Sequence, residues 1–103
     1  MNTNKQEILE NICYTELVYQ RINKKLNSSF SKKYIEEYIL EILKETDTLF
    51  FTKIGKNFYV KNAKNNIRIT INSYTFRVIT VDKLKIELLP TNIKRSRRVT
   101  LNS

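Results

Sequence analysis

The apolar residues in the first part of the chain recur at helical intervals. Asn4 and Glu7 have the spacing of a capping box, so a helix is expected to begin near residue 4. The apolar positions that follow at helical spacing are Ile8, Leu9, Ile12, Leu17, Val18, Ile22 and Leu26. Residues 12–15 are poor helix formers, so one long helix and two helices with a restart at Thr15 both stay open.

A further helix is predicted between a turn at residues 27–29 and Thr46. Ser31 is a favourable N-cap, and Phe30 and Ile35 are spaced to form a hydrophobic staple around it. The apolar stripe of this helix consists of Ile35, Tyr38, Ile39, Ile42 and Leu43. The first half of the chain is therefore expected to form two or three helices.

From Leu49 onward the apolar residues alternate with a period of two, which is typical of half-buried strands. Four strands are predicted, at residues 49–54, 57–62, 67–72 and 74–81, with turns at 55–56, 63–66 and 72–73. Residues 83–89 fit a fifth strand or a short helix, which ends at Pro90. The predicted fold is α+β, with the helices packed on one face of an antiparallel sheet of four or five strands.

Chain length favours one domain, because 103 residues suit a single hydrophobic core. We expect this domain to cover residues 1–89 and a basic, flexible tail to cover residues 90–103. The apolar runs are far shorter than the roughly 20 residues that cross a bilayer, and the amino terminus is polar. A cytoplasmic protein without a membrane segment is therefore expected.

Composition excludes several kinds of chemistry. Cys13 is the only cysteine and there is no histidine, so the sequence offers neither an internal disulfide nor the commonest metal ligand and general base. Cys13 is interpreted as a small buried residue on a helix. No catalytic residue, metal ligand or cofactor is indicated.

Charge is distributed unevenly along the chain, whose formal net charge is +9. Up to Asp47 there are seven Lys and Arg residues against eight Asp and Glu, and beyond it there are twelve against two. Between Thr48 and Val81 there is no acidic residue at all. A general bias towards lysine would not remove acidic residues from one half, so an anionic partner is favoured over a merely solvated face.

The strongest candidate site follows from the predicted hairpin. A two-residue turn at 72–73 would place Arg68 opposite Arg77 on the sheet face away from the helices. Like charges in that position are unfavourable unless an anion lies beside them. Tyr59 and Lys61 are expected on the same face, and Arg, Lys, Tyr and Thr side chains suit the phosphates and bases of an unpaired strand.

Further cations are expected to widen this surface. They are Lys53, Lys56 and Lys64, together with Arg95, Arg97 and Arg98 of the tail. Arginine-rich tails commonly add affinity for polyanions without sequence preference, and they also serve simply to keep a protein soluble.

Three stretches carry a resemblance to a known family: residues 11–18, residues 55–60 and, most specifically, residues 66–80, which read NIRITINSYTFRVIT. The chain resembles a family of short bacterial proteins, found mostly in Firmicutes, that is defined only as a domain of unknown function. The resemblance covers about residues 5–84. It implies a bacterial cytoplasmic origin and a mobile-element or phage setting, and it transfers no catalytic residue.

Three functions fit these observations. The leading hypothesis is a non-catalytic domain that binds single-stranded RNA or DNA. The second is a mobile-element-encoded inhibitor, comparable to an anti-CRISPR protein, that binds a host defence nuclease or ribonucleoprotein. The third is a metal-free ribonuclease toxin in which Arg68, Arg77 and Tyr59 stabilise the transition state, although no general base is evident.

Overall fold

A computed structural model describes residues 4–84 and has the predicted α+β architecture. Three helices come first: α1 (Asn4–Asn11), α2 (Glu16–Leu26) and α3 (Lys32–Glu45). A 3-10 turn, η1 (Thr48–Phe50), leads into four strands, β1 (Phe51–Ile54), β2 (Asn57–Asn62), β3 (Ile67–Asn72) and β4 (Val78–Lys83). Of the element predicted at residues 83–89, a fifth strand or a short helix, Lys83 instead ends β4, and residues 85–89 and the basic tail lie outside the described residues. Within residues 4–84, none of the helices has the length and apolarity needed to cross a bilayer.

The helical region before residue 27 consists of two helices, because the residues between them pair with the sheet. The Cys13 amide donates to the carbonyl of Phe76 at 3.0 Å, and the Val78 amide donates to the carbonyl of Cys13 at 3.0 Å. Cys13 thus forms a parallel bridge with Arg77 and is exposed, not buried on a helix as the sequence suggested. By contrast, Ser31 caps α3 as predicted, since its side chain accepts a hydrogen bond from the Tyr34 amide.

The four strands form an antiparallel meander in the order β1-β2-β3-β4. Phe51 pairs with Val60 between β1 and β2, and Val60 pairs with Ile69 between β2 and β3. The strand boundaries agree with prediction for β2 and β3. The first strand begins at Phe51 and not at residue 49, because residues 48–50 form the 3-10 turn, and β4 covers Val78–Lys83 and not residues 74–81. Among the described strands, the outer edge of β1 has no partner.

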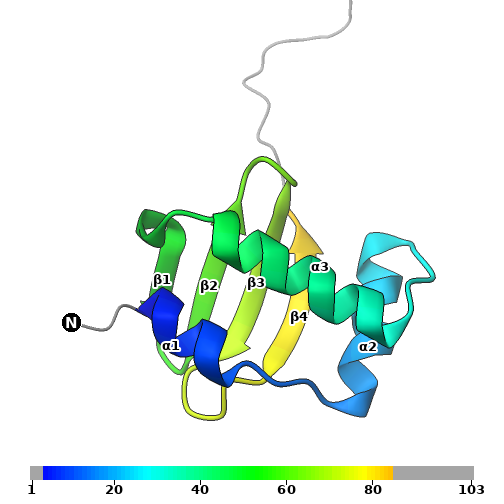
Figure 1. Cartoon of the computed structure of the whole chain (residues 1–103), viewed down its shortest axis with the longest axis horizontal. Coiled ribbons are helices and arrows are strands. Elements are labelled where there is room, and N and C mark those ends of the chain that lie inside the picture. The colour runs from blue at the N-terminus through cyan, green and yellow to red at the C-terminus, as the bar shows by residue number, and fades with distance from the viewer. Residues whose placement is uncertain (1–3, 85–103) are drawn as a thin grey trace, which may run out of the picture.

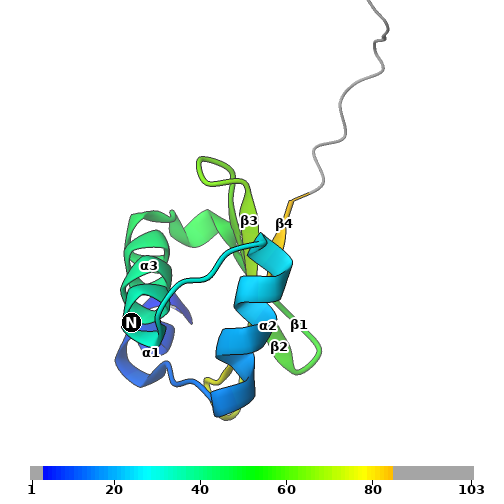
Figure 2. The same cartoon turned by 90° about the vertical axis from the view of Figure 1, so that its right-hand side faces the viewer.

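The hydrophobic core lies between the sheet and the helices α1 and α3, which cover one face of the sheet (Figure 1). Its fully buried side chains include Ile8 of α1, Ile39 of α3 and Ile69 of β3. Helix α2 packs along β4 and buries Val18 and Ile22 (Figure 2). The described helices therefore leave the second face of the sheet uncovered, and we call it the open face.

A polar network ties the end of α3 to the sheet. Lys5 Nζ donates to the carbonyls of Lys44 and Thr46 at 2.7 and 2.8 Å, which satisfies acceptors at the end of α3. The buried Asn62 donates from Nδ2 to Thr46 Oγ1 at 2.7 Å, and Thr46 Oγ1 donates to the carbonyl of Ile42 at 2.6 Å. This network fixes the end of β2 beside the helices.

Candidate anion-binding surface

The open face carries the polar residues of the sheet, because successive side chains of a strand point to opposite faces. Phe58, Val60, Ile69 and Ile71 point towards the helices and are buried. The residues between them therefore occupy the open face, and their cross-strand partners share it. These open-face residues are Tyr59 and Lys61 of β2, Arg68 and Thr70 of β3, and Thr80 and Asp82 of β4.

The predicted hairpin register between β3 and β4 is wrong. Ile71 pairs with Val78 and not with Tyr74, and a bulge then shifts the register so that Thr70 pairs with Thr80 and Arg68 with Asp82. Arg77 lies just before β4 and five residues before Asp82, which is about 16 Å along extended chain at roughly 3.3 Å per residue. The two arginines that the sequence placed opposite each other are consequently well separated.

The cause of the shift is the side chain of Asn72. Its Oδ1 accepts hydrogen bonds from the amides of Tyr74 and Thr75 at 2.8 and 2.9 Å, which closes a local turn inside a longer loop. The loop then returns through Phe76, whose φ of 60° is uncommon for a bulky residue. Backbone hydrogen bonds from Asn72 to Arg77 and from Phe76 to Asn72 complete the loop, so 72–73 is not a two-residue turn.

A like-charged pair exists on the open face, but between different strands. Lys61 of β2 lies directly opposite Arg68 of β3. On the other side of Arg68, Asp82 of β4 approaches its Nη2 at 3.8 Å and is also bound by Lys25 Nζ of α2 at 3.0 Å. One carboxylate is thus shared by two cations, and Lys61 forms no ion pair within residues 4–84.

Arg68 and Tyr59 are in contact on this face. The centre of the Arg68 guanidinium lies 5.8 Å from the centroid of the Tyr59 ring, within the range of a cation–π interaction. Arg68 Nε is buried and makes no hydrogen bond to any described group, while the side chain as a whole remains 43% exposed. A planar cation held against an aromatic ring is suited to binding a phosphate through its remaining N–H groups.

The remaining predicted cations are dispersed. Lys53 pairs with Phe58 and so belongs to the sheet face that the helices cover, although it is exposed at the β1 edge. Lys56 lies in the turn between β1 and β2, at the far end of the sheet from Lys61. Lys64 lies in the turn after β2 and approaches Glu45 Oε1 at 3.8 Å. Arg95, Arg97 and Arg98 fall outside the described residues.

Arg77 lies beside α2 and not beside Arg68. It lines a small hollow at the edge of β4, which it shares with Leu17, Val18 and Arg21 of α2. The ribonuclease hypothesis named Arg68, Arg77 and Tyr59 as side chains that would stabilise the transition state. The structure brings Arg68 and Tyr59 together but does not place Arg77 beside them.

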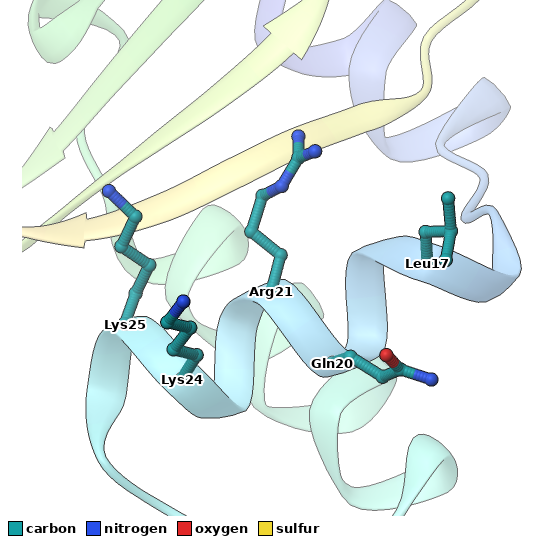
Figure 3. A pocket seen from close by; sticks show the side chains of 5 residues that line it. All are labelled: Leu17, Gln20, Arg21, Lys24 and Lys25. Atoms are coloured by element: carbon teal, nitrogen blue, oxygen red, sulfur yellow. The ribbon is translucent and has the colours of Figure 1, made fainter.

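The sequence reasoning missed the cations of α2. Arg21, Lys24 and Lys25 line a hollow on the outer side of this helix with Leu17 and Gln20 (Figure 3). These cations fall between the apolar positions 18, 22 and 26, a spacing that already places them on the exposed side. Averaging charge over the first 47 residues concealed them, because the acidic residues in that average lie mostly on α1 and α3.

Acidic and basic residues occupy different sides of the described domain. Glu36, Glu37 and Glu41 are exposed on α3, in the layer that covers the other face of the sheet. Beyond residue 47, Asp82 is the one acidic residue that the structure describes. The open face and α2 therefore form the more positive side of the molecule.

Clusters of metal ligands and titratable groups with shifted pKa values are two further features that can mark a functional site in the described part of the chain. Within residues 4–84 no group of three or more Cys, Asp or Glu side chains is placed to hold a metal ion. The most perturbed groups are tyrosines between α2 and α3: burial raises the pKa of Tyr14 well above its ordinary value. Burial, followed by the hydrogen bond to Glu36, raises the pKa of Tyr19 to about 12. These phenols stay protonated at neutral pH and do not adjoin Arg68.

Comparison with protein families gives one match that covers most of the chain. Residues 6–82 match the family model described as "Protein of unknown function (DUF3781)". The chain belongs to this family. The DUF3781 match begins at Gln6 and ends at Asp82, so it includes most of α1, the whole of α2 and α3, and nearly the whole sheet, with Lys61, Arg68 and the cations of α2. Searches of curated proteins and of solved structures give no match.

Proposed function

We propose that this DUF3781 chain is a non-catalytic domain that binds single-stranded RNA or DNA through the open face of its sheet. The observation that carries the proposal is the opposition of Lys61 and Arg68 across β2 and β3. Such a pair is unfavourable in the free protein, and a phosphate bound between the two side chains turns repulsion into attraction.

The neighbouring side chains favour a single strand over other anions. Tyr59 supplies an aromatic ring beside Arg68, and aromatic or guanidinium planes stack on unpaired bases. Thr70 and Thr80 lie on the same face, but Thr70 and the Thr80 hydroxyl are buried, so the accessible groups of this face are Tyr59, Lys61 and Arg68. A sheet face of this composition suits an extended strand whose bases are accessible.

Fluorescence anisotropy with labelled oligouridylate and oligothymidylate of about 12 nucleotides tests the proposal. The wild-type chain is expected to bind, and four phosphate contacts would weaken that binding about fifty-fold between roughly 50 and 200 mM salt. The double variant Lys61→Gln/Arg68→Gln should lose most of the affinity.

The matched control is Lys33→Gln/Lys44→Gln, which removes the same charge from exposed positions at the two ends of α3. This control should retain binding within about twofold, because long-range effects of surface charge are largely screened beyond the Debye length. Equal losses in the two double variants would refute the open face as the binding site. Salt-independent binding would refute phosphate recognition altogether.

A further inference from the structure

The cations that accompany the open face are not centred on the sheet. On β1, Thr52 and Ile54 occupy the open face and carry no charge. Lys61 and Arg68 follow on β2 and β3, and the cations Lys25 and Arg21 lie beyond β4 on α2. Positive charge therefore extends from the middle of the sheet across β4 to the helix.

Helix α2 holds two of its cations across the edge of β4. Arg21 Nη1 donates to the carbonyl of Ile79 at 3.1 Å, and Lys25 Nζ binds Asp82 at 3.0 Å. The two residues are four positions apart and so lie on one side of the helix. Figure 3 shows both side chains reaching from α2 towards the β4 ribbon. The structure thus fixes these cations beside the open face.

Asp82 lies between the cations of the open face and those of α2, and its single negative charge does not neutralise both groups. It forms ion pairs with Arg68 and Lys25, and it is the one acidic side chain that the structure describes between residues 48 and 84. The hollow on the outer side of α2 is lined by Arg21, Lys24 and Lys25 and by no carboxylate. Glu16, the acidic residue of α2, instead forms an ion pair with Lys32.

We propose that a single nucleic-acid strand crosses β2, β3 and β4 on the open face and continues over the β4 edge onto α2, where Arg21 and Lys24 bind its next phosphates. This inference rests on the proposed function and adds the direction and length of the bound strand. Neighbouring strands are about 4.8 Å apart and a helix is about 10 Å wide, so the path is about 20 Å long. The part of this path that lies on the sheet crosses two strand spacings and is about 10 Å long, so a strand that also reaches α2 must be longer than one that occupies the sheet alone.

The test compares a long and a short probe on the whole chain. Oligothymidylate of about 12 nucleotides is long enough to reach α2 from the sheet, whereas a thymidine dinucleotide is too short to contact the sheet and the helix together. The variant Arg21→Gln/Lys24→Gln is expected to weaken binding of the long probe at least about tenfold at low salt and to reduce its salt slope by about 1.4, or about 0.7 per lost contact. The affinity of the short probe, measured by its competition with the long probe, should differ by less than about twofold between this variant and the wild type.

Two further variants separate charge from structure. Arg21→Lys/Lys24→Arg keeps both charges and should bind the long probe like the wild type, even if the hydrogen bond to Ile79 is altered. Lys33→Gln/Lys44→Gln removes the same charge from α3 and should also bind normally. Circular dichroism of each variant establishes that it is folded.

The outcomes distinguish the two proposals. If Lys61→Gln/Arg68→Gln abolishes binding while Arg21→Gln/Lys24→Gln behaves like the α3 control, the open face stands and the path onto α2 is refuted. Equal affinity for the long and short probes, or tighter binding of a duplex than of a single strand, also refutes the path. If the wild-type chain binds no oligonucleotide, the proposed function itself fails.

Discussion

Lys61 and Arg68 lie directly opposite each other on neighbouring antiparallel strands, and the carboxylate that approaches Arg68 comes from the strand beyond. In the free protein this arrangement costs stability, because like charges in opposed positions repel. This unfavourable pair lies on the surface where we expect a polyanion to bind. A substitution that removes one of its charges should therefore raise the free energy of unfolding and weaken polyanion binding.

Lys61→Gln is therefore expected to raise the free energy of unfolding by about 0.2–1 kcal/mol while weakening oligonucleotide binding. Urea unfolding at low salt measures the first effect. The gain should shrink near about 1 M salt, where charges are screened within about 3 Å. Lys53→Gln, which removes a lysine opposite Phe58, should give no comparable gain; if it does, net charge and not the opposed pair is responsible.

Two threonines whose hydroxyl groups are buried should respond in opposite ways to replacement by valine. Thr80 Oγ1 is buried and makes no hydrogen bond to a described group, so Thr80→Val is expected to raise the free energy of unfolding by about 1 kcal/mol. Thr46 Oγ1 donates to Ile42 and accepts from Asn62, so Thr46→Val should lower it by about 1–3 kcal/mol. Thermal or urea unfolding of both variants tests this prediction. A lower free energy of unfolding for Thr80→Val would show that the Thr80 hydroxyl forms a hydrogen bond in the folded protein.

The loop between β3 and β4 should depend on the acceptor at position 72. Asn72→Ala removes the oxygen that binds the amides of Tyr74 and Thr75, and is expected to cost about 1–2 kcal/mol of unfolding free energy. Asn72→Asp keeps an acceptor there and should stay within about 0.5 kcal/mol of the wild type. Similar losses in both would mean that the amide nitrogen, and not the oxygen, matters.

The tyrosines between α2 and α3 should make the protein less stable in strong alkali. Their pKa values are raised in the folded state, for Tyr19 to about 12, so folding favours the protonated phenol. This contribution is complete below the ordinary tyrosine pKa of about 10 and is lost as the pH rises towards about 12. Urea unfolding should show a steeper fall over that interval in the wild type than in Tyr14→Phe/Tyr19→Phe, and parallel curves below about pH 9. If the free energy of unfolding had the same pH dependence in both proteins throughout, the raised tyrosine pKa values would be contradicted.

Local signals in the sequence were sufficient for most of the fold. The N-cap at Ser31 and the alternation of Phe58 and Val60 depend on neighbours in the chain, and both were predicted correctly. The same alternation correctly placed Tyr59, Lys61 and Arg68 on one face.

The position of Arg77 could not be predicted in this way. It depends on the side-chain turn of Asn72, on a positive φ at Phe76 and on a bridge to Cys13, which is more than sixty residues away in the chain. None of these has a signature in the short window that surrounds the hairpin. The break between α1 and α2 has the same long-range cause.

The sheet has two unlike edges, since β4 is occupied by α2 and Cys13 whereas β1 has no described partner. Intermolecular strand pairing needs a vacant edge on each participant, and a molecule with one such edge can join only one neighbour in this manner. Any self-association by edge pairing would thus stop at a closed twofold pair. Fibre growth, which requires two vacant edges on every subunit, is blocked for as long as α2 stays in place.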